Sequence, residues 1–257
     1  MRPFRIVAVT QSDPFFTGRF FETFLPECRQ LGVETVEVVL LRNFNESRTA
    51  LAARMWKLYG TLDMMRLLGR YAYSRVEEGF GIPRSVEAVA AKHGIATRAL
   101  ATINDPAYLS TLSLRGVDVL LSVAAPEIFR PTALTAAPLV LNVHCGKLPQ
   151  YRGMMPTFWA LHRGEREITI TVHTMAEKID RGDVLAEYPV YVRADDTAFD
   201  LAVRAKEVAG RAVARLLSRL QTEPVQARPM NVAQQRYFKF PTRQHAQELR
   251  AAGRRML

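Results

Sequence analysis

The sequence of 257 residues contains few cysteines and no long hydrophobic run. Its two cysteines, Cys28 and Cys145, lie far apart and form no CxxC pair, which argues against a disulfide scaffold. No stretch reaches the roughly 18 apolar residues that a membrane span needs. The N-terminal apolar run, residues 6–9, is too short for a signal peptide. These absences predict a cytoplasmic protein with reduced thiols and no membrane partner.

Nucleotide-binding and metal-binding signatures are also missing. The first turn, TQSDPFFTG, lacks the G-x-G-x-x-G fingerprint, and the G-x-G at Gly79 and Gly81 has Arg84 in place of the third glycine. No P-loop motif is present, and the histidines show no ligand spacing such as H-E-x-x-H. We therefore expect neither a nicotinamide enzyme, nor a P-loop enzyme, nor a metal site.

Basic residues outnumber acidic residues in this sequence. Lys and Arg number 35 against 25 Asp and Glu, a formal net charge of +10. Such a balance can attract nucleic acid or anionic small molecules. The arginines are spread along the chain apart from Arg250, Arg254 and Arg255, and no nucleic-acid-binding motif surrounds these three. The sequence therefore argues against a nucleic-acid partner and is compatible with a phosphorylated small molecule.

The spacing of apolar residues predicts an α/β protein. Parallel strands are expected at 5–10, 35–41, 95–100, 117–123 and 138–143, and an antiparallel extension at 168–174 and 184–192. Helices are expected at 17–31, 85–93, 131–135, 156–163, 197–220 and from about 243 onward. Residues 105–115 are expected to lead into the strand at 117–123. The order predicts a Rossmann-like, mostly parallel sheet flanked by helices.

Residues 45–77 are predicted to be helical and amphipathic. The apolar positions that follow helical spacing are Leu51, Met55, Leu58, Leu62, Met65 and Leu68. Because such stripes usually pack in a core, we expect this one to face the interior. A partner surface, such as a homodimer interface, is the alternative.

Polar side chains occur at the carboxyl end of the strand at 138–143. In open α/β sheets, ligands bind at that end of the strands. Asn142 and His144 alternate with Val143, so both can project from one face of the strand. An asparagine amide can donate a hydrogen bond to a developing oxyanion, and an imidazole can exchange a proton with an amine near neutral pH. Taken alone, however, a strand-end histidine is more often structural.

A carboxylate follows about three dozen residues later, in the segment IDRGD. Asp180 can fold back to His144, orient its ring and stabilise its cation. The alternative is that Asp180 and Asp183 are turn residues beside Gly182.

Together these residues resemble the formyltransferase family, which includes glycinamide ribonucleotide, methionyl-tRNA and sugar-nucleotide formyltransferases and formyltetrahydrofolate deformylase. The family signature is Asn-x-His, then Leu-Pro, a short gap and Gly, with an Asp further on. Here it consists of Asn142-Val143-His144, Leu148-Pro149, Gly153 and Asp180. The resemblance covers roughly residues 5–220. It implies a formyltransferase-type catalytic domain over 1–220, with a short C-terminal extension over 221–257 that ends in a helix.

The sequence departs from the family at two places. Cys145-Gly146 stands where many members have Pro-Ser, and Ala176 stands where several have an acidic residue. Cys145 is disfavoured as a nucleophile because the family resemblance implies direct attack by an amine. In addition, adjacent residues of a strand face opposite ways.

The resemblance implies transfer of the formyl group of 10-formyltetrahydrofolate to a primary amine, with Asn142, His144 and Asp180 as catalytic residues and no metal. It places the pterin ring between two segments, Ala125, Pro126, Glu127, Ile128 and Phe129 on one side and Met175, Ala176 and Glu177 on the other, with Ile128 and Phe129 as apolar walls. The expected acceptor contacts are Gln11, Ser12, Asp13, Tyr151, Arg152, Gly153 and Met154.

The acceptor is expected to be a small amine, with a nucleotide-linked amino sugar as the first choice. Residues 221–257 are too few for the C-terminal barrel domain that methionyl-tRNA formyltransferases carry, which argues against an initiator-tRNA acceptor. A 10-formyltetrahydrofolate hydrolase and a methionyl-tRNA formyltransferase-like enzyme are the alternatives. A non-enzymatic RNA-binding protein is the least favoured interpretation.

Overall fold

A seven-stranded sheet dominates the computed structural model, which describes residues 2–41, 47–223 and 225–257. Its strand order is β3-β2-β1-β4-β5-β7-β8, with β1 to β5 parallel and β7 and β8 antiparallel. The strands are β1 (Phe4–Gln11), β2 (Val33–Leu41), β3 (Ala96–Leu100), β4 (Val119–Val123), β5 (Leu139–His144), β7 (Glu167–Thr174) and β8 (Val184–Tyr191). Each strand expected from the sequence is present within two residues, and the mostly parallel α/β architecture is confirmed.

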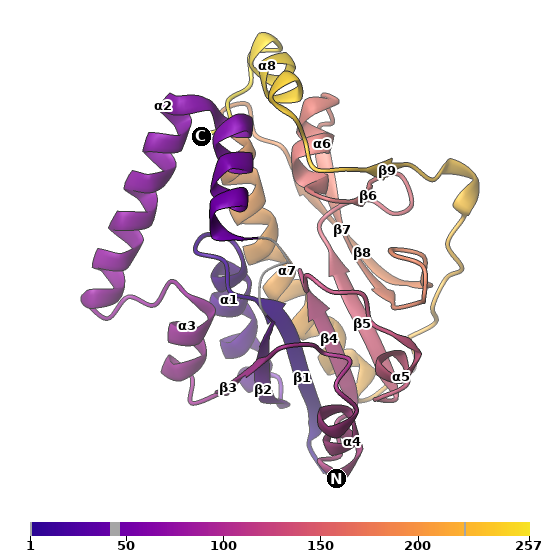
Figure 1. The fold of residues 1–257 in the computed structure, drawn as a ribbon. Coiled ribbons are helices and arrows are strands. Elements are labelled where there is room, and N and C mark those ends of the chain that lie inside the picture. Colours follow the sequence, from indigo (N-terminus) through magenta and orange to yellow (C-terminus); the bar gives the residue numbers. More distant parts are fainter. Residues whose placement is uncertain (1, 42–46, 224) are drawn as a thin grey trace.

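Helices cover both faces of the sheet (Figure 1). Alternate side chains of β1 enter different clusters, Ile6 and Ala8 on one face and Val7 and Val9 on the other. The first cluster includes α1 (Thr17–Gln30), α3 (Val86–Lys92), α6 (Pro156–His162), α7 (Ala198–Leu220) and α8 (Arg243–Ala251). The second, smaller cluster lies under α4 (Pro106–Leu114) and α5 (Pro131–Leu134). This alternation explains the nearly continuous apolar runs of the central strands.

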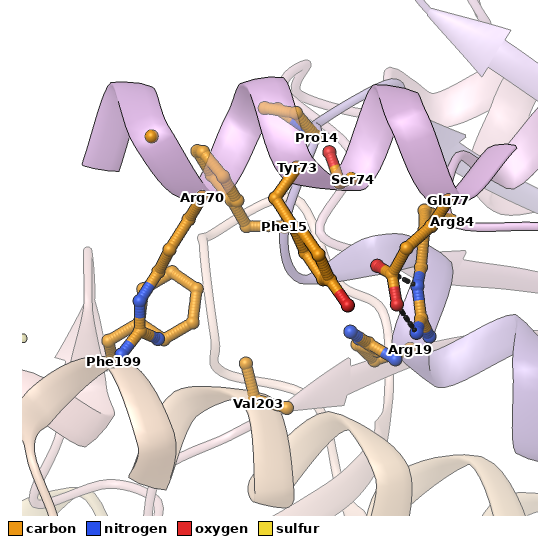
Figure 2. A pocket seen from close by; sticks show the side chains of 11 residues that line it. Pro14, Phe15, Arg19, Arg70, Tyr73, Ser74, Glu77, Arg84, Phe199 and Val203 are labelled. Atoms are coloured by element: carbon orange, nitrogen blue, oxygen red, sulfur yellow. Dashed lines mark hydrogen bonds and ion pairs between the residues drawn. The ribbon is translucent and has the colours of Figure 1, made fainter. Parts of the chain in front are cut away.

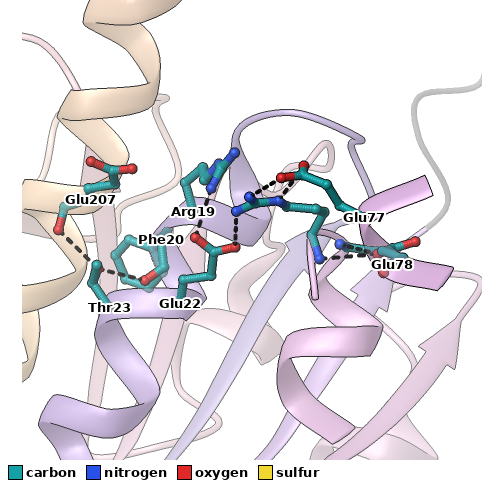
Figure 3. Close-up of polar contacts among 9 residues, drawn as sticks. Arg19, Phe20, Glu22, Thr23, Glu77, Glu78 and Glu207 are labelled. Carbon is teal, nitrogen blue, oxygen red and sulfur yellow. Dashed lines mark hydrogen bonds and ion pairs between the residues drawn. The ribbon is translucent and has the colours of Figure 1, made fainter. Parts of the chain in front are cut away.

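Helices α1 and α7 approach each other closely at Gly210. A Cβ atom at this position would lie 2.1 Å from Thr23 Oγ1 and 2.4 Å from the Phe20 carbonyl oxygen, so only glycine fits. The Thr23 hydroxyl donates a hydrogen bond of 2.9 Å to the Glu207 carbonyl across the contact (Figure 3). The two helices therefore form one rigid layer behind β1.

Helix α2 (Arg48–Gly79) contradicts part of the core prediction. Leu58 is buried, but Leu62, Met65 and Leu68 are 66%, 58% and 45% exposed, so the apolar stripe does not continue into the core. The physical reason is Gly60, whose φ of 76° interrupts the helix and changes the face that the following residues present. Residues 45 and 46 of the predicted stretch lie outside the described part of the chain.

Two arginines fix α2 to the rest of the protein. Arg84 donates hydrogen bonds of 2.7 and 2.8 Å to Glu77 of α2 and forms an ion pair of 3.2 Å with Glu22 of α1, a network shown in Figure 3. Near the kink, Arg250 of α8 lies 2.8 Å from Asp63. The helix is thus anchored near both ends of its second half by charged contacts.

Besides a 3-10 helix at Val232–Gln234, three elements were missed. The sequence DPAYLSTLSL forms α4, with the Asp105 side chain accepting from the Ala107 amide and Pro106 in the first turn. An Asp-Pro pair is a helix-start signal that the prediction of a simple lead-in overlooked. The short strands β6 (Arg152–Gly153) and β9 (Tyr237–Phe238) pair in a second, two-stranded sheet. Among the described residues, no helix is long and apolar enough to cross a membrane.

Candidate active site

The candidate site lies where β5 and β7 pair. Their antiparallel register sets Asn142 opposite His173 and His144 opposite Thr171. Leu141, Val143, Ile170 and Val172 all enter the first core cluster. Because side chains alternate along a strand, the polar residues of both strands share the other face of the sheet. Two histidines and one asparagine therefore meet at this edge.

The loop between β7 and β8 returns Asp180 to this edge. Its base is closed by two hydrogen bonds, from the Thr174 amide to the Asp183 carbonyl (2.8 Å) and from the Asp183 amide to the Thr174 hydroxyl (2.9 Å). Gly182 packs so tightly there that a Cβ atom would lie 1.6 Å from the Thr174 carbonyl oxygen. Asp180 itself adopts a left-handed conformation with φ of 53°, which aspartate tolerates better than most residues.

The Asp180 carboxylate stands between the two histidines. Its Oδ1 atom is 3.8 Å from His144 Nδ1 and 3.9 Å from His173 Nε2, and its Oδ2 atom accepts a hydrogen bond of 2.9 Å from the Gly153 amide. The first two distances are too long for direct hydrogen bonds, so the interaction with the rings is electrostatic. With only 8% of its side chain exposed, this charge acts on the rings in a weakly screened setting.

His144 is held by its other ring nitrogen. Its Nε2 atom lies 2.6 Å from the Tyr151 carbonyl oxygen, so this nitrogen carries the hydrogen and donates it. Gly146 lies directly under the ring, because a Cβ atom there would be 3.0 Å from His144 Nε2 and 2.5 Å from Pro156 Cβ. This close contact explains sterically why a glycine occupies position 146, where the sequence departs from the family pattern.

His173 is the residue that the sequence reasoning missed. Its Nδ1–H donates to the Thr174 carbonyl (2.7 Å), and its Nε2 accepts from the Asn142 amide nitrogen (3.1 Å). Burial, followed by electrostatic repulsion between the two histidine rings when both are protonated, lowers the pKa of His173 to about 4. The neutral ring thus fixes the orientation of the Asn142 amide and leaves its second N–H free to donate elsewhere. The available signal was the alternation of ITVHT, which puts His173 on the same face as Asn142 once the strands pair.

The loop at 147–155 buries much of what was predicted to touch an acceptor. The Tyr151 hydroxyl donates to Glu165 (2.5 Å), and the Arg152 guanidinium donates to the Ile179 carbonyl (2.5 Å) and to Gln235 (3.0 Å). The Met154 amide donates to the Phe238 carbonyl (2.9 Å). The side chains of Tyr151 and Arg152 therefore brace the loop, and the Gly153 amide holds Asp180.

Gln11 ends β1, and Ser12 and Asp13 follow it; β4 lies between β1 and β5, which are therefore about 10 Å apart. The Asp13 carboxylate accepts hydrogen bonds from the amides of Phe15, Phe16 and Thr17, so it caps α1. This local role accounts for Asp13 without a ligand. The strand order leaves the segment two strands away from β5.

The two segments expected to hold the pterin lie beside opposite ends of β5, with residues 125–129 beyond its carboxyl end and Met175 next to Val140 near its start. Ala125 and Met175 pack on the second core cluster, and Met175 donates its amide to the Val140 carbonyl (2.9 Å). Glu127 ties its loop to the residues after β3, since it accepts from the Thr102 hydroxyl and the Ile103 amide. Phe129 is 2% exposed and belongs to the core, so its ring does not form a wall, whereas Ile128 is exposed. Pro126 is half-buried, and Ala176 and Glu177 are exposed.

A cavity of about 460 Å³ lies elsewhere, between α1, α2 and α7 (Figure 2). Phe15, Phe199 and Val203 form its apolar part, and Arg70 lies over the Phe199 ring at 4.4 Å. Its lining comes from the helices on the α1–α7 face, opposite to the face that carries Asn142 and His144. The cavity is therefore distinct from the candidate site. Groups of three or more metal-ligating side chains are absent from the described residues.

Comparison with known proteins decides the family. A family model described as formyl transferase matches residues 75–217, which is more than half of the chain. The chain belongs to the formyl transferase family. The resemblance drawn from Asn142, His144 and Asp180 is thereby confirmed at the level of the family.

Curated relatives in the formyl transferase family include methionyl-tRNA formyltransferases. The one from Rhodopirellula baltica is 34% identical over 141 residues, covering 54% of this chain and 42% of the relative. The one from Anaeromyxobacter dehalogenans is 35% identical over 138 residues, covering 53% of this chain and 44% of the relative. The chain thus matches less than half the length of these proteins.

Solved structures support a formyl transferase fold. Glycinamide ribonucleotide transformylase 1 from Symbiobacterium toebii aligns with a TM-score of 0.58 at 18% identity, covering 89% of this chain and 95% of that one. An N-formyltransferase from Helicobacter canadensis, in complex with folinic acid and dTDP-3-aminofucose, aligns with a TM-score of 0.55 at 16% identity, covering 92% of this chain and 71% of that one. At such identities the likeness establishes the fold alone.

Proposed function

We propose that this protein is an N-formyltransferase that moves the formyl group of 10-formyltetrahydrofolate to a primary amine. The observation that carries the proposal is the cluster of Asn142, His144, His173 and Asp180 at one sheet edge of a formyl transferase family member. We further propose that residues 1–220 form the catalytic domain and that 221–257 brace the loop beside the site through β9.

The chemistry of the residues fits the formyl donor. Exposed Ile128 with partly buried Ala125 and Met175 offers apolar surface beside backbone amides and carbonyls, which suits a flat heteroaromatic ring. The Glu127 carboxylate, which is already bonded to residues 102–104, keeps this loop in place. The pterin is therefore proposed to lie between residues 125–129 and 175–177, with its walls formed by Ile128 and Met175 rather than Phe129.

In the proposed reaction the amine attacks the formyl carbon, a new C–N bond forms, and the bond from that carbon to the folate nitrogen breaks. The second N–H of Asn142 donates to the developing oxyanion, since its first is committed to His173. Asp180 stabilises positive charge on His144. His144 passes the proton lost by the amine to the departing folate nitrogen.

For the acceptor, we propose a small amine, with a nucleotide-linked amino sugar first. Two observations support this choice. Strand β9 already covers the loop at 152–153, leaving less room there for a folded RNA, and the formal net charge of +10 suits a phosphate-bearing substrate. Methionyl-tRNA is the second candidate, because the relatives at 34% and 35% identity carry that activity in their names.

A panel of amines tests both levels of the proposal. The protein is mixed with 10-formyltetrahydrofolate and each acceptor in turn, and release of tetrahydrofolate is followed by absorbance. Consumption that depends on an amine supports the transferase, and the acceptor with the highest kcat/KM identifies its class. Consumption without an amine would assign a hydrolase instead. Absence of consumption with every acceptor, charged methionyl-tRNA included, would refute the proposal.

A further inference from the structure

The cavity between α1, α2 and α7 has a lining that simple helix packing does not explain. Its volume of about 460 Å³ lies within the range of about 300–1,000 Å³ in which small molecules bind. Cavities that stay empty in proteins are lined by apolar side chains. Here three arginines from separate segments line the space together with aromatic rings (Figure 2). They are Arg19 of α1, Arg70 of α2 and Arg84 from the loop before α3.

One wall of the cavity is a preformed aromatic surface. Phe15 packs edge-on against Phe199 with ring centroids 5.6 Å apart, and Phe16 lies 5.1 Å from the same ring. The Arg70 guanidinium covers the Phe199 ring at 4.4 Å. Figure 2 shows the exposed Tyr73 side chain extending from α2 into the cavity. Because planar rings stack on aromatic side chains and on guanidinium planes, this wall suits a ligand with a planar ring.

The end of the cavity near Arg84 is held in place by ion pairs. Arg84 donates hydrogen bonds of 2.7 and 2.8 Å to the two oxygens of Glu77, so the charge of this lining carboxylate is already balanced. Glu22 joins Arg84 at 3.2 Å to Arg19 at 3.1 Å (Figure 3). A Cβ atom at Gly18 would lie 1.9 Å from the Arg84 carbonyl oxygen, so α1 contacts this loop directly. The end wall therefore exists before any ligand binds.

Hydrogen-bond donors on the cavity side lack acceptors. Arg70 makes no hydrogen bond to another described residue, because its ion-pair partner Asp200 is 3.7 Å away. Arg19 donates one hydrogen bond, to Glu22, although a guanidinium carries five N–H groups. Within the part of the chain that the structure describes, the Tyr73 hydroxyl has no hydrogen-bond partner either. Acceptor oxygens of a ligand would satisfy these donors.

Gly69 leaves room between α2 and α7. It lines the cavity, and a Cβ atom added there would meet nothing within 4 Å. Inside a helix, glycine is unfavourable relative to alanine, and neither a close contact nor a positive φ requires it at this position. From residue 69 to residue 77 the helix rises roughly 12 Å, which is the length of cavity open to a ligand.

These features suit a ligand with a planar ring and one anionic group. Three carboxylates already balance the three arginines, so a polyphosphate would add uncompensated negative charge. We propose that the cavity binds an aromatic anion of about the size of a nucleoside monophosphate, with its ring on Tyr73 and Arg70 and its phosphate or carboxylate on Arg19. The site lies on the face opposite to Asn142 and His144, so the proposal is independent of the proposed function.

Isothermal titration calorimetry of the full chain tests the ligand class, in about 150 mM salt to screen unspecific attraction to the basic surface. The probes are adenosine monophosphate, indole-3-acetate, adenosine and inorganic phosphate. At least one of the first two should bind with a Kd below about 100 μM, and adenosine and phosphate at least about tenfold more weakly, because each lacks half of the ligand. Binding of adenosine monophosphate alone assigns nucleotides, and binding of indole-3-acetate alone assigns aromatic carboxylic acids. If neither binds, or if adenosine or phosphate binds equally well, the proposal is wrong.

Two variants of opposite kind test the place of binding. Arg70→Gln removes donors, and Gly69→Leu fills the cavity, so each should weaken binding by about tenfold or more with unchanged circular dichroism. The matched control is Arg66→Gln, since Arg66 lies on the same helix, pairs with Asp63 and does not line the cavity. Arg66→Gln and Asn142→Ala should bind the probe as the wild type does. Wild-type binding in both cavity variants, or binding lost only in Asn142→Ala, would overturn the proposal.

Discussion

The paired edge of β5 and β7 and the second half of α2 place polar and apolar side chains in opposite ways: the first buries polar groups, and the second exposes apolar ones. At the strand edge, His144, His173 and the Asp180 side chain are more than nine-tenths buried. On α2, Tyr73 and Phe80 are 65% and 82% exposed. Buried polar groups cost free energy unless they are paired, and exposed apolar patches are uncommon on monomers. The buried polar groups of the first region and the exposed apolar side chains of the second are therefore not explained by the stability of the fold alone.

The way each region is built differs as well. The paired strands are tightly packed, because Gly146 and Gly182 contact neighbouring atoms so closely that a side chain would not fit at either position. The second half of α2 is held by the buried Met64 and Leu67 and by a few ion pairs, and a Cβ atom added at its Gly69 would meet nothing within 4 Å. Chemistry needs fixed geometry within a fraction of an ångström, whereas an interface needs area. The tight contacts of the first region suit the proposed reaction, whereas the open surroundings of Gly69 on α2 do not.

Removing the His144 imidazole should give the largest effect. In His144→Ala we expect kcat for formyl transfer to fall by about a thousandfold, because the proton relay is lost. Steady-state kinetics measures the fall in kcat. The matched control is His162→Ala, because His162 at the end of α6 contacts Glu248 of α8 and lies away from the paired edge of β5 and β7. A loss of less than about threefold would remove His144 from the mechanism.

The pH dependence of stability should reveal the neutral His173. Its pKa is lowered to about 4 in the folded protein, below the ordinary value of 6.5, so the unfolded chain binds more protons between these values. Stability should be fully present above about pH 6.5 and fall as pH drops toward 4, by about 1–3 kcal/mol from this group. Urea unfolding across this range measures it, and His173→Gln should flatten the slope. An unchanged slope in the variant would show that other groups cause it.

A methyl group at Gly182 should disturb the site from a distance. In Gly182→Ala the new Cβ would overlap the Thr174 carbonyl at 1.6 Å, so the base of the loop that holds Asp180 must open. We expect a loss of about 1–3 kcal/mol in the free energy of unfolding, with a lower kcat. Thermal unfolding and steady-state rates test both, and wild-type values would show that the loop has slack.

The same substitution on α2 should act in the opposite direction. Gly69 is helical and its added Cβ would meet nothing within 4 Å, so Gly69→Ala should raise stability by about 0.5–1 kcal/mol through helix propensity. Urea unfolding of the wild type and the variant measures the gain. A destabilised variant would mean that the helix is packed more tightly than the structure shows.

Local pattern was enough to predict most of the fold. Continuous apolar runs such as residues 6–9 and 119–121 located the strands within two residues, and the Asn142, His144 and Asp180 motif located the candidate site. What could not be predicted depends on how separate segments meet. His173 becomes a partner of Asn142 only through the register of β5 and β7, and Tyr151 and Arg152 turn inward because of Glu165, Ile179 and Gln235. Likewise, the outward direction of Leu62 follows from the kink at Gly60, whose left-handed conformation is not encoded in apolar spacing.

One measurement tests the division between the two regions directly. Amine-dependent release of tetrahydrofolate is compared in the wild type, Asn142→Ala and Leu62→Glu, with circular dichroism recorded on the same samples to check the fold. The account predicts that Asn142→Ala stays folded and loses about a hundred- to thousandfold in rate, because an oxyanion donor is gone. Leu62→Glu, which changes an exposed side chain of α2 away from this edge, should keep the wild-type rate. An Asn142→Ala protein that transfers formyl groups at the wild-type rate would contradict the central claim that the edge of β5 and β7 carries the reaction.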